Sequence, residues 1–114
     1  IDIALPFAYA NEELVTELSR MEPFGQGNAR PCFGQKNVGI RAARVLGKNR
    51  NVVKLSLRDE AGTVREALAF TDGDAFLAEM EGSRSIAVLY YPEINEYMGR
   101  RNLQLVLKAW KFAR

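Results

Sequence analysis

The sequence contains no histidine and a single cysteine, Cys32, among its 114 residues. Without histidine, neither a Ser-His-Asp triad nor a Cys-His pair can form, and no metal site can include a histidine ligand. One cysteine also excludes an internal disulfide and a cysteine-rich zinc site. We therefore expect that this chain alone is not an enzyme and holds no metal or cofactor of its own.

Long apolar runs are also missing, so no segment is expected to span a bilayer, and no signal-peptide pattern opens the chain. A hydrophobic content of 47% and a length of 114 residues are ordinary for one globular domain. The lone cysteine fits a reducing compartment, so a cytoplasmic location is expected. The chain begins with Ile1 instead of Met, which suggests a piece of a longer protein.

Acidic residues are absent from positions 29–58, which carry eight cations. Residues 1–28 hold five acids and one base, residues 59–96 hold nine acids and two bases, and residues 97–114 hold five bases and no acid. Because the whole chain has a net charge of only +2, this is segregation and not general basicity. Gathering like charges costs self-repulsion, and the usual benefit is a positive surface that attracts a polyanion. Solvated strand faces are the simpler alternative, so charge alone leaves nucleic-acid contact open.

The pattern of apolar residues predicts a helix, three strands, a second helix and two more strands. Asn11 can cap a first helix that runs to Arg20, and a turn-rich connector covers 22–28. The period then changes from helical to two near Val38, and a slip of phase at Arg44 predicts a bulge there.

The remaining boundaries follow from alternation and turn residues. The later expected strands cover 53–58, 63–70, 85–91 and 103–112, a helix ends at Gly82, and a loop runs from Pro92 to Asn102. Three meandering strands, a helix and two strands is the plan of the OB-fold, a small closed barrel. We therefore predict a mainly β protein, a five-stranded OB-fold barrel with an N-terminal helix and a short helix between strands three and four.

In an OB-fold the ligand lies across strands two and three, between the loop that joins strands one and two and the loop that joins strands four and five. Ten residues on the two loops and on strands one, two and five are predicted to bind DNA: Arg41, Arg44, Lys48, Arg50, Lys54, Arg58, Tyr97, Arg100, Arg101 and Lys108. Their cations would neutralise phosphates and release counterions. Two basic blocks that are distant in sequence are thus expected to converge on one side of the barrel.

Single strands also need planar side chains under their bases. Tyr97, in the expected second loop, is the first candidate, ahead of Phe70 and Tyr91. Phe70 alternates with Leu68, which favours a place in the core. Trp110 is expected to seal the barrel or to pack on the first helix.

Acidic and glycine motifs have structural explanations that need fewer assumptions than functional ones. Asp72-Gly73-Asp74 could be half of a metal site, but a helix N-cap with a turn glycine explains it more simply. Asp59 and Glu60 are interpreted as hairpin residues and not as a catalytic pair. Gly25-Gln26-Gly27 has no following Lys-Ser/Thr, so it is interpreted as a turn and not as a phosphate loop.

Two longer motifs carry a family resemblance. Residues 21–28 read MEPFGQGN and are followed by Pro31 and Phe33, and residues 94–105 read INEYMGRRNLQL. They resemble the LEPFGxGNPxPxF and NEYxGxxxLQL segments of the RecJ family of single-strand-specific exonucleases. The two motifs bracket residues 18–110, which is most of the chain.

The resemblance implies a bacterial protein in which residues 1–28 are a helix and connector from a preceding catalytic core and residues 29–114 are an OB-fold domain. In this family the nuclease removes nucleotides from the 5′ end of single-stranded DNA during repair and recombination, with Mn or Mg held by Asp and His motifs of the DHH type. Those motifs are absent here, so no catalytic or metal role carries over. The implied partners are single-stranded DNA, the catalytic core of the same parent chain and other repair proteins.

Two other classes of function remain open. OB barrels also bind peptides, so a protein-interaction module is the alternative, with the acidic block at 59–96 as a docking surface. An independent enzyme is the third. Phosphate-dominated binding depends steeply on salt, whereas docking in an apolar groove does not.

Overall fold

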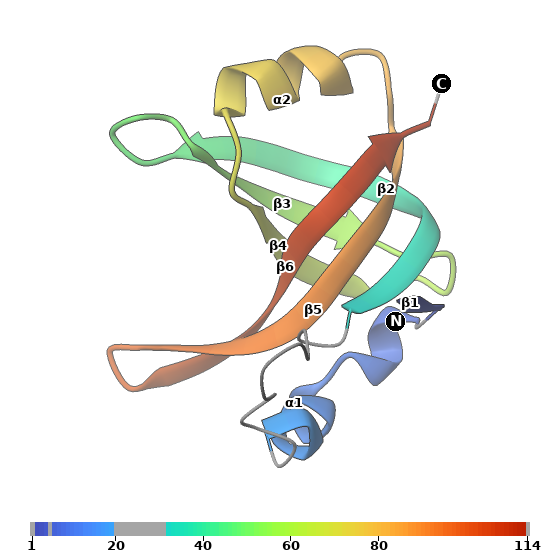
Figure 1. Cartoon of the computed structure of the whole chain (residues 1–114), viewed down its shortest axis with the longest axis vertical. Helices are drawn as coiled ribbons and strands as arrows, with labels where there is room; N and C mark the ends of the chain where they lie inside the picture. Colours follow the sequence, from blue (N-terminus) through green and yellow to red (C-terminus); the bar gives the residue numbers. More distant parts are fainter. Residues whose placement is uncertain (1, 5, 20–31, 114) are drawn as a thin grey trace.

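The computed structural model describes residues 2–4, 6–19 and 32–113 (Figure 1). In chain order the elements are β1 (Asp2–Ala4), the 3-10 helix η1 (Phe7–Tyr9), α1 (Glu12–Ser19), β2 (Cys32–Leu46), β3 (Val52–Arg58), β4 (Val64–Ala69), α2 (Gly73–Met80), β5 (Ser85–Tyr97) and β6 (Arg100–Phe112). The expected connector at 22–28 lies outside the described residues. No helix in the described ranges is long and apolar enough to cross a membrane.

The strands close into a barrel in the order β2-β3-β4-β6-β5, and β5 pairs again with β2. All of these pairs are antiparallel except β4 with β6, which run parallel. The short strand β1 adds a parallel partner to the start of β2. The predicted OB-fold is confirmed, with the helix α2 between the third and fourth barrel strands and covering one end of the barrel (Figure 1).

The core follows from the alternation seen in the sequence. Val53, Leu55 and Leu57 of β3 are buried, while the residues between them are partly exposed. This is the period of two expected when one face of a strand meets the core. At the α2 end, Trp110 packs on Phe76 of α2, with ring centroids 5.4 Å apart. Trp110 therefore helps to close the barrel beneath α2 and does not lie on α1.

The other end of the barrel is closed by the segment before α1. Phe7 is fully buried and meets the ring of Tyr90 edge-on, with centroids 5.6 Å apart. The backbone N–H of Phe7 donates to Asp59 Oδ2 at 2.9 Å, and the N–H of Thr63 donates to Asp59 Oδ1 at 2.8 Å. Burial, together with the Asp59 charge, raises the pKa of Tyr90, so its phenol stays protonated. Asp59 is thus the hairpin residue that was expected, and it also fastens the N-terminal segment.

The helix α1 begins as the sequence predicts. The Asn11 side-chain Oδ1 accepts the N–H of Leu14 at 2.9 Å, and Glu12 and Glu13 fill the first turn. Leu14 packs against the core. The cap therefore fixes where the chain leaves the barrel end sealed by Phe7.

The bulge in β2 lies three residues earlier than predicted. Register with β3 shifts between Ile40 and Ala42, so Arg41 is the extra residue, and the prediction of a bulge at Arg44 is wrong. The sequence does not locate the bulge because Ala42 and Ala43 are both small enough to face either the core or the solvent. It is Ala43 that packs on the core, while Ala42 is exposed.

The prediction of a loop from Pro92 to Asn102 is wrong, because most of these residues extend β5 and β6 into a long hairpin. Pairing continues through Tyr97 with Arg100, leaving a turn of two residues. Beyond Tyr90, β6 is the only strand paired with β5 among the described residues. Proline is tolerated on such an edge, so Pro92 does not end the strand.

The hairpin turn offers a first test. Met98 has φ +53° and Gly99 has φ +77°, both in the left-handed region that a two-residue turn of type I′ requires. Asn adopts this region more readily than Met, and the Met98 side chain is 84% exposed. We expect Met98→Asn to raise the free energy of unfolding by about 0.5–1 kcal/mol in urea denaturation. Met98→Leu is the control and should change nothing; equal effects of both variants would contradict this explanation.

Candidate nucleic-acid interface

The two predicted basic loops belong to two hairpin tips. Lys48 and Arg50 lie in the turn between β2 and β3, and Arg100 and Arg101 begin β6 at the far end of the β5–β6 hairpin. Figure 1 shows both tips projecting from the same side of the barrel, the β2–β3 turn near the top and the β5–β6 tip near the bottom. The outer surface of the barrel between them is the candidate interface.

The register places further cations on that outer surface. Arg44 of β2 is paired with Lys54 of β3, and Ser56 lies beside Glu66 of β4. A shallow groove of about 280 Å³ crosses these strands. Its lining residues are Ala42, Ala43, Arg44, Lys54, Leu55, Ser56 and Glu66. We call it the β2–β4 groove.

Three of the predicted cations are matched by carboxylates from the acid-rich parts of the chain. Lys54 lies 3.3 Å from Glu66. Arg101 contacts Glu12 of α1 at 3.2 Å and Glu96 of β5 at 2.9 Å. These pairs are exposed, so each contributes little to stability. They do reduce the positive charge that the sequence count suggests.

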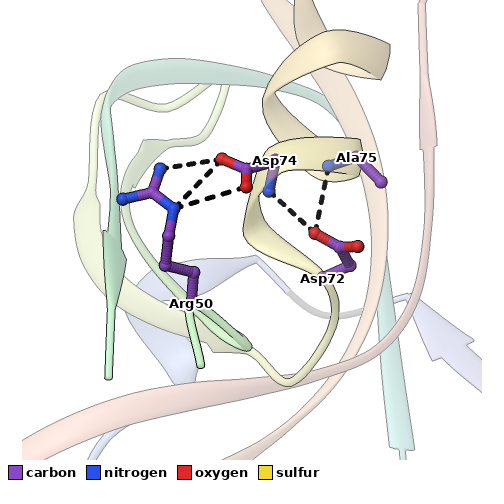
Figure 2. A network of polar contacts seen from close by, with 4 residues as sticks. All are labelled: Arg50, Asp72, Asp74 and Ala75. Atoms are coloured by element: carbon purple, nitrogen blue, oxygen red, sulfur yellow. Dashed lines mark hydrogen bonds and ion pairs between the residues drawn. The ribbon is translucent and has the colours of Figure 1, made fainter. Parts of the chain in front are cut away.

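The third of these cations, Arg50, joins the β2–β3 turn to α2 (Figure 2). Arg50 Nη2 donates to Asp74 Oδ1 at 2.8 Å, and Arg50 Nε donates to the same oxygen at 3.1 Å. Asp72 caps α2 by accepting the N–H groups of Asp74 and Ala75 at 3.0 and 3.3 Å. The expected N-cap is therefore present in the described structure, and the negative charge of α2 faces the predicted DNA-binding turn.

This pair has a definite pH dependence. The hydrogen bond from Arg50, and then its charge, lowers the pKa of the Asp74 carboxyl, and Asp74 raises the pKa of Arg50 in return. A carboxyl with a lowered pKa stabilises the fold above its ordinary pKa. That contribution disappears as pH falls through the lowered value, so the β2–β3 turn is tied to α2 at neutral pH.

Five predicted cations make no ion pair within the described part of the chain and are exposed. They are Arg41, Arg44, Lys48, Arg58 and Arg100. Lys108 instead places its Nζ 5.9 Å from the ring centroid of Tyr91, a cation–π contact that covers one face of that ring. Tyr97 is paired through its backbone with Arg100, and its side chain is outside the described set.

The prediction that Phe70 is a core residue is wrong, because 63% of it is exposed. In β4 the buried residues are the small ones, Ala67 and Ala69. Ala67 is in register with Leu55 on one side and Leu105 on the other, and these two large side chains fill the interior at that level. Glu66 and Leu68, which alternate with these alanines, are exposed or half-buried, and Phe70 continues their phase. No signal in the local alternation distinguishes the two phases.

The outer wall formed by β2, β5 and β6 is different in character. It carries an open hollow of about 680 Å³, whose lining includes Lys36, Ala87, Leu89, Ala109 and Trp110. No residue of the β2–β4 groove lines it. Within the described ranges, no group of three or more Asp, Glu or Cys residues could hold a metal ion.

The closed barrel, with α2 over one end, places the chain among OB-fold domains. A family profile described as the RecJ OB domain matches residues 1–109, and the chain belongs to this family.

Two bacterial proteins named single-stranded-DNA-specific exonuclease RecJ are similar in sequence. The protein from Bacillus subtilis (strain 168) is 29% identical over 96 residues, which cover 84% of this chain and 12% of that protein. The protein from Haemophilus influenzae is 30% identical over 98 residues, 85% of this chain and 17% of that protein. The chain thus spans less than a fifth of either relative.

Solved structures share the fold. RecJ from Thermus thermophilus in complex with Mg²⁺ has a TM-score of 0.68 and 21% identity, covering 99% of this chain and 16% of that chain. Its complex with Mn²⁺ has the same TM-score and 23% identity, covering 98% and 15%. The mitochondrial single-stranded DNA binding protein Rim1 from S. cerevisiae has a TM-score of 0.51 and 14% identity, covering 72% of this chain and 94% of Rim1.

Proposed function

We propose that this chain is the non-catalytic domain of a RecJ-like exonuclease that binds single-stranded DNA. The main support is the position of the cations: the β2–β3 turn and the β5–β6 tip project from the same side of the barrel (Figure 1), and the β2–β4 groove adds Arg44 and Lys54 on strands next to that turn. Arginine and lysine there neutralise phosphates and release counterions, which favours a flexible polyanion whatever its sequence. Membership of the RecJ OB domain family supports the same assignment.

The parent protein supplies the chemistry in this proposal. Its catalytic core would remove nucleotides from 5′ ends in DNA repair and recombination in a bacterial cytoplasm, using Mn or Mg held outside this chain. The OB domain would keep the strand close to that core. Tethering raises the effective concentration of the strand at the active site, so modest affinity of the isolated domain is sufficient.

The test is a titration of a fluorescent single-stranded oligonucleotide at several salt concentrations. Arg44→Ala with Lys48→Ala removes two exposed cations that make no ion pair within the described residues. Each phosphate contact on a single strand contributes about −0.7 to the slope of log K against log salt, so this double variant should make the slope shallower by about 1.4.

A matched control removes the same charge elsewhere. Lys36→Ala with Lys111→Ala takes two cations from the hollow on β2, β5 and β6. This variant should keep the parent slope. Equal losses in the two double variants would mean that only net charge matters and that the assigned interface is wrong. Binding that barely responds to salt would instead favour the interaction-module alternative.

A further inference from the structure

Phe70 is a large apolar side chain in contact with solvent, at the end of β4 next to the start of β3. It directly follows β4, whose last residue, Ala69, is buried. An isolated exposed apolar residue is common and needs no explanation. Phe70 differs because of what surrounds it.

The residues beside Phe70 form an apolar row followed by a basic row. Leu46 is paired with Val52, and continuing the β3–β4 register places Phe70 next to Val52. Leu46 is exposed and Val52 is half-buried. Two residues further along each strand, Arg44 is paired with Lys54 on the same outer face. The turn that carries Lys48 connects β2 and β3 at this end.

We propose that Phe70 is a stacking platform for a nucleobase, with Arg44 and Lys48 holding the neighbouring phosphates. This inference rests on the proposed function and adds the bases to it. A phosphate surface alone binds single and double strands alike, whereas an exposed ring can stack only on a base that is not already stacked in a duplex. Phe70 therefore gives the interface its preference for single strands. Because every base has a π-face, little base preference is expected.

Two other aromatic residues of the described set, Tyr91 and Tyr9, fit this role less well. Tyr91 already lies under the Lys108 ammonium. Tyr9 is as exposed as Phe70, at 64% against 63%, but it belongs to η1 at the end of the barrel opposite α2 (Figure 1). Tyr9 is therefore the matched control, an exposed ring at the other end of the barrel from Arg44 and Lys48.

The experiment compares Phe70→Ala, Phe70→Tyr and Tyr9→Ala of this chain on three ligands. These are a single-stranded oligothymidylate, an abasic strand of the same length and a duplex of that length. We expect Phe70→Ala to weaken binding of the oligothymidylate roughly 5- to 150-fold, the range found for loss of one base–aromatic stack. Binding of the abasic strand and of the duplex should be unchanged. Phe70→Tyr keeps a ring and should bind as the parent does, as should Tyr9→Ala.

The outcomes separate the two proposals. If the parent binds with steep salt dependence but Phe70→Ala loses nothing, or loses as much on the abasic strand, the stacking role is wrong and the phosphate interface stands. If the parent itself shows no salt-dependent binding of any strand, the proposed function fails, and the stacking role with it. Circular dichroism melting checks that Phe70→Ala folds, and Phe70→Tyr tests the ring independently.

Discussion

Phe7→Ala is expected to lower the free energy of unfolding by about 3–5 kcal/mol, the usual cost of removing a buried phenylalanine. Phe7 is completely buried, and its ring packs against Tyr90 at 5.6 Å. Truncation would leave a cavity at the end of the barrel, beside the buried Asp59 that accepts the Phe7 N–H. A domain of this size has a total stability of roughly 5–15 kcal/mol, so the variant should be marginal. Urea denaturation followed by circular dichroism measures the change.

Tyr9→Ala is the control for this prediction, since Tyr9 lies in the same short helix but is mostly exposed. It should change stability by less than about 0.5 kcal/mol. If Phe7→Ala cost no more than Tyr9→Ala, the N-terminal segment would not be part of the barrel core. The predicted boundary between residues 28 and 29 would then also separate two independent folding units.

Gly73→Ala is expected to destabilise the fold by about 1–3 kcal/mol, or to move α2, because there is no room for a methyl group. A Cβ at Gly73 would lie 2.4 and 2.6 Å from the two Cγ atoms of Val45 and 2.9 Å from the carbonyl oxygen of Arg50. The same close approach lets the Gly73 N–H donate to the Arg50 carbonyl at 2.7 Å. The start of α2 is thus fastened to the β2–β3 turn by backbone as well as by the Arg50–Asp74 pair.

Gly34→Ala is the matched control, because its added Cβ would lie 3.9 Å from the nearest atom, the carbonyl oxygen of Val88. It should stay within about 1 kcal/mol of the parent. Combining Gly73→Ala with Val45→Ala removes the two closest clashes and should recover part of the loss, measurable as a coupling energy. If the coupling were zero, the clash with Val45 would not be the cause.

Much of the fold could be predicted from local patterns. The alternation of Val53, Leu55 and Leu57 is strict, and Asp72 is a strong cap, so β3 and α2 were predicted near their observed places. The length of the β5–β6 hairpin could not be predicted, because Pro92 and its polar neighbours resemble a loop until their pairing with β6 is known. The predicted position of the bulge is wrong for a similar reason. Two successive alanines, Ala42 and Ala43, can each face the core or the solvent, so the alternation does not show that Arg41 is the extra residue.

The cations of the candidate site could be predicted from the sequence, but the carboxylates that pair with them could not. Charge blocks identify Arg50 and Arg101, but their contacts with Asp74 and Glu12 join residues far apart in sequence. Such contacts depend on how α1 and α2 dock on the barrel. The exposure of Phe70 was missed because the choice of inward face in β4 is made by Leu55 and Leu105 on the adjacent strands, not by β4 itself.

The Arg101 guanidinium links the tip of the β5–β6 hairpin to α1. Arg101 forms ion pairs with Glu12 on α1 and with Glu96 on its own hairpin, so both carboxylates contact the same guanidinium. A phosphate that takes over the Nε and Nη1 donors of Arg101 would displace both carboxylates, and α1 would then lose this contact with the hairpin. DNA bound at the tip and the Glu12 carboxylate of α1 would in that case compete for the same guanidinium.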